Sequence, residues 1–182
     1  MLISLKHVTR LYGKVIGVND LTLDLPVGAY GLVGPNGSGK TTLINLLIGN
    51  LRPTIGRVGI FGDNPRKRRQ LLRRIGLCPA TDVLYPNVSA REWVRYLVRL
   101  HGFTHLESDR RAVESLATVD MTDNMHRPMG EYSLGMRQRT KIAQAIAHDP
   151  EFLILDEPYN GLDPVGRYQM TELLKVWTSK GK

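Results

Sequence analysis

A glycine-rich segment that ends in lysine and threonine is the part of this sequence whose residue types and spacing point most directly to chemistry. Its eight residues 34–41, GPNGSGKT, follow the pattern G-x-x-x-x-G-K-[ST]. Glycines let the backbone curl so that several N–H groups face an anion, and a helix that starts after Lys40 adds its positive end. Lys40 would reach the β- and γ-phosphates, and Thr41 could bind Mg²⁺. The segment therefore predicts a phosphate-binding loop, with a simple turn between strand and helix as the alternative.

Two adjacent acids form the second candidate site. Asp156 and Glu157 follow the apolar run FLIL at residues 152–155. A carboxylate at the end of a buried strand can hold Mg²⁺ through water, and its neighbour can orient and polarise the water that attacks a phosphate. The alternative is that the two acids only cap the following turn. The presence of a phosphate loop in the same chain favours the chemical role.

The elements that must position these motifs alternate between strands and helices. Residues 3–11 and 21–25 alternate apolar and polar positions, which predicts an antiparallel element. The apolar run 29–33 predicts a buried strand that leads into the glycine loop, and helical spacing follows it until Gly49. The run 152–155 is typical of a central parallel strand. This order predicts an α/β fold with a mainly parallel sheet.

The region between the two motifs carries helical patterns. Ser89 and Glu92 have the spacing of a capping box, which predicts the start of a helix. Further helices are expected over residues 108–118 and 136–147, and the last of these would place Lys141 among the basic residues opposite its apolar face.

The composition limits the classes to which the chain can belong. Its 182 residues, 42% hydrophobic and 23% charged, predict one globular domain. No apolar stretch approaches the roughly 20 residues of a membrane-spanning helix. The single cysteine, Cys78, is expected to be a small buried hydrophobe and favours a reducing compartment. The net charge of +8 permits several anionic partners. The basic segment 65–74 contains no aromatic residue, so we expect a solvated surface and no direct nucleic-acid binding, with binding of anionic lipid headgroups or nucleic acid as the alternatives.

Together these motifs resemble the ATPase domain of ABC transporters. The resemblance covers nearly the whole chain and includes an aromatic residue at Tyr12, the loop 34–42, the signature YSLGMRQR at 132–139, the strand and acids 152–157, and NGLDP at 160–164. It implies a P-loop NTPase fold with a central mainly parallel sheet, a small antiparallel β element and a helical subdomain over about residues 81–147. The chain 1–182 would be a single ABC ATPase domain.

The resemblance also implies roles for individual residues. Two such domains would enclose two ATP molecules with Mg²⁺, with Glu157 as catalytic base, Lys40 on the phosphates, and Thr41 and Asp156 on the metal side. Tyr12 would stack on adenine, with core or strand-edge packing as the alternative. The nucleotide-binding residues implied in this way are Tyr12, Gly34, Pro35, Asn36, Gly37, Ser38, Gly39, Lys40, Thr41, Thr42, Ser133, Gly135 and Asp163.

The function implied is that of an ATP-binding and ATP-hydrolysing subunit of a transporter. With Leu134 and Met136, the signature resembles that of the family branch that contains bacitracin and daunorubicin exporters, so export is expected. The partners would be a second ATPase domain, identical or different, and a transmembrane permease on a separate chain, docked on residues 81–99. The subunit would sit at the cytoplasmic face of the membrane.

Departures from the family pattern favour a rival interpretation. Ala80 stands where the family has a Gln or Glu that contacts the metal, and no histidine follows Glu157, although the family has one in a switch region that contacts the γ-phosphate. Tyr159 stands where a small hydroxyl residue is commoner. We therefore expect ATP binding with weak or absent turnover by this chain. The alternative function is a non-hydrolysing nucleotide-binding fragment or regulatory module.

Overall fold

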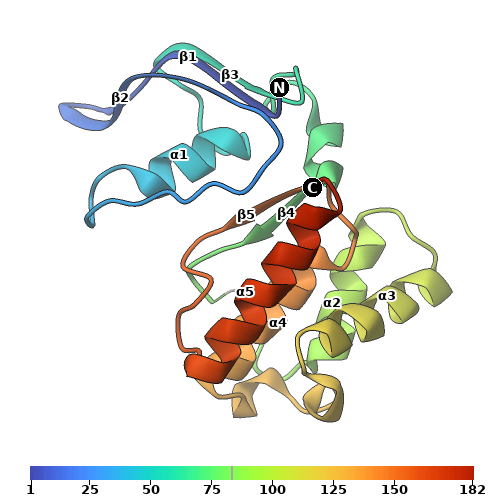
Figure 1. Cartoon of the computed structure of the whole chain (residues 1–182). Helices are drawn as coiled ribbons and strands as arrows, with labels where there is room; N and C mark the ends of the chain where they lie inside the picture. Colours follow the sequence, from blue (N-terminus) through green and yellow to red (C-terminus); the bar gives the residue numbers. More distant parts are fainter. Residues whose placement is uncertain (83) are drawn as a thin grey trace. The chain divides into compact units, whose positions relative to one another are not determined.

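Two groups of secondary-structure elements make up the fold (Figure 1). The computed structural model describes residues 1–82 and 84–182, which divide into two units: residues 1–72 with 177–182, and residues 73–176. Each unit is described by itself.

The first unit contains the predicted antiparallel element. Strands β1 (Ile3–Tyr12), β2 (Val15–Leu25) and β3 (Ile55–Ile60) pair in the order β2-β1-β3, and both pairings are antiparallel. β1 and β2 are joined by a tight turn at Gly13, whose φ of 61° suits glycine. Leu5, Val8 and Ile60 are almost wholly buried, and Leu46 of helix α1 (Lys40–Leu47) is buried as well. The alternation of apolar residues therefore predicted the antiparallel pairing of β1 with β2 correctly, although β2 begins at Val15 and not at residue 21.

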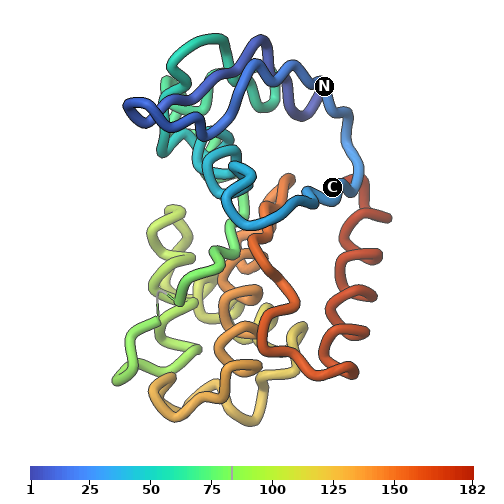
Figure 2. The backbone as a smooth tube through the Cα atoms, turned by 90° about the vertical axis from the view of Figure 1, so that its left-hand side faces the viewer, coloured from blue at the N-terminus to red at the C-terminus, as the bar shows by residue number. Residues whose placement is uncertain are grey.

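The strand predicted over residues 29–33 is absent, so that prediction was wrong. These residues have no strand assignment, and Tyr30, Leu32 and Val33 are exposed, Val33 to 94%. Figure 2 follows the backbone of this stretch toward α1. A strand needs a neighbour to accept its hydrogen bonds, and the sheet of the first unit pairs only β1, β2 and β3. Apolar composition indicates a tendency to be buried but does not supply the neighbour.

The second unit contains a parallel pair of strands. β4 (Ile75–Cys78) and β5 (Phe152–Leu155) run parallel, with Ile75 opposite Phe152 and Cys78 opposite Leu155. Helices α2 (Ala90–Leu100), α3 (His105–Thr118) and α4 (Leu134–Ile146) lie between these strands in sequence, and α5 (Pro164–Ser179) follows β5. Short 3-10 turns occupy Arg69–Arg74, Thr122–Asn124 and Met129–Glu131. The predicted parallel arrangement of 152–155 is confirmed.

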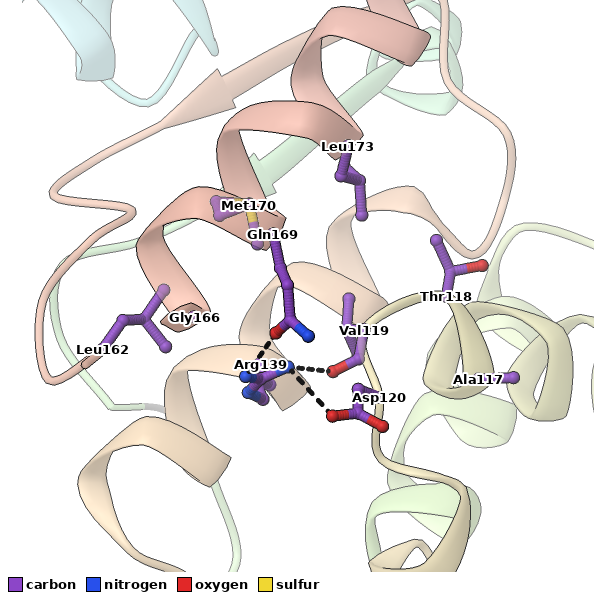
Figure 3. Close-up of a pocket in the computed structure, with 10 residues that line it drawn as sticks. All are labelled: Ala117, Thr118, Val119, Asp120, Arg139, Leu162, Gly166, Gln169, Met170 and Leu173. Atoms are coloured by element: carbon purple, nitrogen blue, oxygen red, sulfur yellow. Dashed lines mark hydrogen bonds and ion pairs between the residues drawn. The ribbon is translucent and has the colours of Figure 1, made fainter. Parts of the chain in front are cut away.

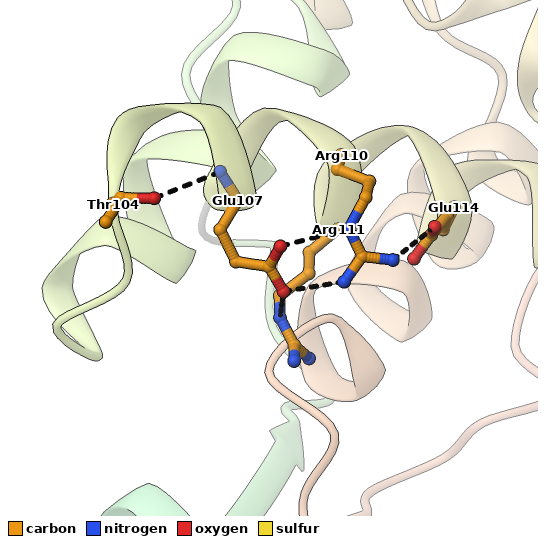
Figure 4. A network of polar contacts seen from close by, with 5 residues as sticks. All are labelled: Thr104, Glu107, Arg110, Arg111 and Glu114. Atoms are coloured by element: carbon orange, nitrogen blue, oxygen red, sulfur yellow. Dashed lines mark hydrogen bonds and ion pairs between the residues drawn. The ribbon is translucent and has the colours of Figure 1, made fainter.

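Local sequence signals explain where the helices of this unit begin. The capping box of Ser89 and Glu92 is present, as predicted. α3 begins three residues earlier than expected because Thr104 caps it, accepting a hydrogen bond of 3.3 Å from the Glu107 backbone N–H. Figure 4 shows how Glu107 and Glu114 then bracket Arg110 along the exposed face of α3. No helix in the described parts of the chain is long and apolar enough to span a bilayer.

Candidate functional site

The glycine loop ends in a helix whose first turn is open to an anion. Gly37 and Gly39 have φ values of 83° and 92°, which glycine adopts without strain. A Cβ at Gly39 would collide with the backbone oxygen of Gly17, whereas Gly37 has open space around it. α1 begins at Lys40 with no side-chain cap and no acidic residue in its first turn. Its first N–H groups therefore remain available to a bound anion.

Lys40 is folded back onto its own loop. Its ammonium group donates hydrogen bonds to the backbone oxygens of Gly34, at 2.7 Å, and Pro35, at 2.8 Å. The Ser38 backbone N–H also donates to the Pro35 oxygen, at 3.2 Å, which closes a turn around the exposed Asn36. The carbonyls hold the ammonium over the curled backbone, so a phosphate that enters the loop would meet a positive charge already in place.

Two threonines follow Lys40 on α1. The Thr41 backbone oxygen accepts a hydrogen bond of 2.8 Å from the Asn45 side chain. The Thr42 hydroxyl lies 3.4 Å from the hydroxyl of Tyr12, which projects from the end of β1. The first unit therefore places Tyr12 beside the helix that starts at the phosphate loop.

The two acids lie at the carboxyl end of β5 in the second unit. The Asp156 backbone N–H donates to the Cys78 oxygen at 2.9 Å, which extends the pairing of β4 with β5 by one residue. Glu157 has a φ of 52°, which is unusual for a residue other than glycine. Such backbone strain persists where the surroundings hold it in place.

Gln138 contacts the backbone at Glu157, together with the Asn160 backbone N–H, which donates to the Glu157 oxygen at 3.1 Å. Sequence reasoning missed Gln138. It is buried in α4, and its side-chain amide donates to the backbone oxygens of Glu157, at 3.4 Å, and Pro158, at 3.1 Å. The same nitrogen lies 3.7 Å from the Cys78 sulfur. Gln138 belongs to the signature, but its partners lie 19 and 20 residues further along the chain, so no local pattern indicates the contact.

The signature turn packs on the loop that follows the acids. Ser133 caps α4, accepting a hydrogen bond from the Met136 backbone N–H at 3.2 Å. A Cβ at Gly135 would stand 3.1 Å from the Gly161 oxygen, and Gly161 itself has a φ of 71°. Asp163 accepts a hydrogen bond of 2.8 Å from the Gly166 backbone N–H at the start of α5. The second unit thus brings Ser133, Gly135 and the loop before Asp163 together.

Lys141 does not lie on the exposed face of α4, and that prediction was wrong. Its side chain is only 3% exposed, and its ammonium group lies 3.1 Å from both the Ala80 backbone oxygen and an Asp82 carboxylate oxygen. Arg137 approaches the other Asp82 oxygen at 3.7 Å. A lysine can be buried where a carboxylate compensates its charge, and Asp82 supplies that charge. The helical pattern alone did not show it, because the compensating acid lies about 60 residues away in sequence.

Two other titratable groups have shifted pKa values without forming a site. Burial raises the pKa of the Cys78 thiol to about 11, so Cys78 behaves as the buried hydrophobe that was predicted. Burial also lowers the pKa of His148, to about 4, and its ring stacks on His101 with the centroids 3.9 Å apart. Within residues 1–82 and 84–182, no group of three or more His, Cys, Asp or Glu side chains could hold a metal ion.

A small hollow of about 130 Å³ lies between α3, α4 and α5 (Figure 3). Arg139 crosses it, donating to the Val119 backbone oxygen at 2.9 Å and to the Gln169 side chain at 2.8 Å, with Asp120 at 3.8 Å. Leu162 and Gly166, which flank Asp163, form part of its wall. The hollow is distinct from the phosphate loop, which belongs to the other unit.

The class of protein is an ATP-binding cassette. Three features define it: a P-loop ahead of a helix, an acid pair after a parallel strand, and a capped signature helix. The sequence pattern of the ABC transporter family matches residues 18–160, and the chain belongs to that family. The resemblance drawn from the motifs is confirmed.

The relatives of this chain include exporter subunits. It is 39% identical over 175 residues to the bacitracin transport ATP-binding protein BcrA of Bacillus licheniformis, covering 95% of this chain and 56% of that protein. It is 35% identical over 182 residues to the Nod factor export ATP-binding protein I of Burkholderia orbicola, covering 99% of this chain and 60% of that protein. The chain thus spans little more than half the length of these relatives.

Solved structures confirm the fold. A dimeric bacterial ABC transporter cassette matches with a TM-score of 0.91 at 27% identity, covering 100% of this chain and 85% of that one. A dimeric ATP-binding cassette in a post-hydrolysis state, bound to ADP and phosphate, matches with a TM-score of 0.89 at 26% identity, with the same coverage. The predicted P-loop NTPase fold is therefore correct.

Proposed function

We propose that this chain binds ATP with Mg²⁺ and hydrolyses it, as the ATP-binding subunit of an exporter. The observation that carries the proposal is the loop before α1, where two glycines with positive φ, an ammonium group held over the loop and an uncapped helix start all favour an anion. The loop residues from Gly34 to Thr42 would hold the triphosphate, and Tyr12 would lie against the base.

The acids after β5 would carry the chemistry. Asp156 and the hydroxyl of Thr41 are oxygen donors of the kind that Mg²⁺ prefers. The ion, when bound, would neutralise charge on the phosphate oxygens. Glu157 would orient the attacking water and accept its proton, while Lys40 stabilises the negative charge of the γ-phosphate. Gln138 supports this role because it fixes the backbone from which the Glu157 carboxylate projects.

A second ATPase domain would complete each site. The resemblance assigns Ser133 and Gly135 to the γ-phosphate held by the partner's loop, and Asp163 to communication across the dimer. The position of these residues at the start of α4 supports this assignment, because the positive N-terminal end of a helix favours an anion. The similar solved cassettes are dimers. Whether the two domains are identical or different would depend on the transporter.

Export would require a separate permease, as the names of the relatives suggest. The subunit would then be peripheral to the membrane, at its cytoplasmic face. We place the permease contact on residues 81–99, of which Val83 lies outside the described residues. Tyr85 and Trp93 pack together there, with ring centroids 5.2 Å apart, and Tyr85 is exposed. Helices α2 to α4 also support a helical subdomain over about 81–147 within one ATPase domain.

The non-hydrolysing alternative is favoured by one residue. Ala80 has only a methyl group where the family has an amide or carboxylate, so it can neither contact a metal nor position water. Under this alternative, ATP would bind without turnover and the chain would act as a regulatory module.

Calorimetric titration of the chain with Mg²⁺-ATP, beside Lys40→Ala, tests the proposed binding step. We expect saturable binding that is weakened at least about tenfold in the variant, because Lys40 supplies charge-assisted hydrogen bonds to the phosphates. Lys14→Ala, an exposed cation in the β1–β2 turn, is the matched control and should bind as the unmodified chain does. Equal affinity of the Lys40 variant and the unmodified chain would contradict the proposal.

A further inference from the structure

Arg10 lies against the ring of Tyr12, its neighbour two residues along β1. The central carbon of its guanidinium group is 4.8 Å from the centroid of the Tyr12 ring. One guanidinium nitrogen, Nη1, donates a hydrogen bond of 3.0 Å to the Arg52 backbone oxygen, while Nε is buried without a hydrogen-bond partner. Among the residues that the structure describes, Arg10 has no carboxylate partner. The Tyr12 ring and the Arg52 backbone oxygen are therefore the contacts that the guanidinium group makes.

The Tyr12 ring is restrained on two further sides. Its hydroxyl lies 3.4 Å from that of Thr42 on α1, and a Cβ at Gly17 would stand only 2.7 Å from the ring. Tyr12 nevertheless remains 43% exposed. Arg10, Thr42 and Gly17 thus fix the ring at the edge of the phosphate loop while part of its surface stays accessible.

We infer that Arg10 is a positioning residue for the nucleobase, which clamps the Tyr12 ring so that its exposed surface is a preformed stacking platform. The inference rests on the proposed function, since it requires a nucleotide whose phosphates occupy the loop 34–41. A ring that is already fixed loses little conformational freedom when a base stacks on it, so the affinity for a nucleoside triphosphate rises. The ligand class is a triphosphate that carries a planar base.

Arg10 could instead act at a distance, as a positive charge that attracts the triphosphate. The two roles differ in the ligands they affect. A clamp on the ring strengthens binding of ATP and leaves binding of inorganic tripolyphosphate unchanged, because that ligand has no base. A distant charge strengthens both.

The test is titration of the full chain with Mg²⁺-ATP and with Mg²⁺-tripolyphosphate, using Arg10→Ala, Arg10→Lys and the control Lys6→Ala. Lys6 is an exposed cation on the same strand. We expect Arg10→Ala to weaken ATP binding about threefold to tenfold, the range of a cation–π contact, with no change for tripolyphosphate. Arg10→Lys, which keeps a cation able to lie over the ring, should lose less, and Lys6→Ala should change neither ligand. Thermal unfolding of each variant establishes that it is folded.

A double-mutant cycle with Tyr12→Ala shows whether Arg10 acts through the ring. We expect Arg10→Ala to cause no further loss of ATP affinity once Tyr12 is removed. Independent losses, equal losses for both ligands, or unchanged ATP affinity in Arg10→Ala would each overturn the inference. So would equal affinity of the unmodified chain for the two ligands, although the phosphate loop would then stand. Failure of the unmodified chain to bind either ligand would contradict the proposed function itself.

Discussion

Lys141 and Asp82 form an ion pair of 3.1 Å that joins the signature helix α4 to the segment after β4. The pair lies next to Ala80, whose backbone oxygen also accepts a hydrogen bond from Lys141. At this position the chain lacks the amide or carboxylate side chain of the family pattern. Lys141 of α4 therefore holds this segment through Asp82 and the Ala80 backbone oxygen, without a contribution from the side chain of residue 80.

Substitution of Asp82 should lower stability more than substitution of Lys141. Asp82 is 34% exposed on its side chain and Lys141 only 3%. Asp82→Ala strands a buried ammonium group and should lower the free energy of unfolding by about 2–3 kcal/mol. Lys141→Met leaves a carboxylate that water and Arg137 can reach, and should cost about 1 kcal/mol or less. Urea denaturation measures both, and a larger loss for Lys141→Met would refute this ranking.

Gln138→Ala should affect turnover more than nucleotide binding. Removal of the amide takes the side-chain donor from the Pro158 oxygen and leaves the Glu157 oxygen with the Asn160 backbone N–H alone, which loosens the strained residue that carries the proposed base. The expected loss of stability is about 1–2 kcal/mol, and kcat should fall while KM for ATP changes little. Gln70→Ala, an exposed amide, is the control for both measurements. A rise in KM alone would show that Gln138 does not act through Glu157.

The two loop glycines should respond unequally to alanine. The methyl group of Gly37→Ala has no atom nearby, so only the positive φ is unfavourable. The free energy of unfolding should fall by about 1 kcal/mol. Gly39→Ala has the same strain and also drives its methyl group into the backbone oxygen of Gly17, so the loss should exceed about 2 kcal/mol. Thermal unfolding and ATP titration of the two variants provide the comparison. Equal losses would mean that Gly17 moves away without cost.

Stability should fall in mild acid because of His148. Burial, with a further contribution from His101, depresses the pKa of His148 to about 4 from its ordinary value of 6.5. Between these values the unfolded chain binds more protons than the folded one, so the free energy of unfolding decreases as the pH is lowered through that window. The charged groups that also act on the two rings are Arg73, Arg111 and Asp149.

The measurement is the free energy of unfolding from pH 7 to pH 4, with His148→Phe beside the unmodified chain. The variant removes the group that must stay neutral, so its stability should depend less steeply on pH. His126→Gln, an exposed histidine, should leave the slope unchanged. An identical slope for His148→Phe would assign the acid sensitivity to other groups.

Local signals in the sequence predicted the elements that they specify directly. The alternating pattern predicted β1 and β2, and the spacing of Ser89 and Glu92 predicted the start of α2. These elements were predictable because they depend on residues that are neighbours in sequence. The prediction of a strand over residues 29–33 was wrong because a strand also depends on a partner that is distant in sequence. The burial of Lys141 and the contact of Gln138 were not predicted for a related reason, since their partners Asp82 and Glu157 come from other segments of the chain. The turn of the glycine loop and the helix after it were predictable because they depend on consecutive residues.

The decisive measurement is the steady-state turnover of Mg²⁺-ATP by the purified chain and by its Glu157→Gln variant, with bound nucleotide quantified in both. It tests whether the chain binds and hydrolyses ATP with Glu157 as the base. We expect both proteins to bind nucleotide, because the variant keeps the loop 34–41. Phosphate release should be slow, because Ala80 lacks the side chain of the family pattern, and it should be confined to the unmodified chain, because the variant loses the base. Binding without turnover in either protein would favour the regulatory alternative over the hydrolysing subunit. Turnover that survives Glu157→Gln would contradict the role of Glu157 as base, and a lack of nucleotide bound to the unmodified chain would contradict ATP binding.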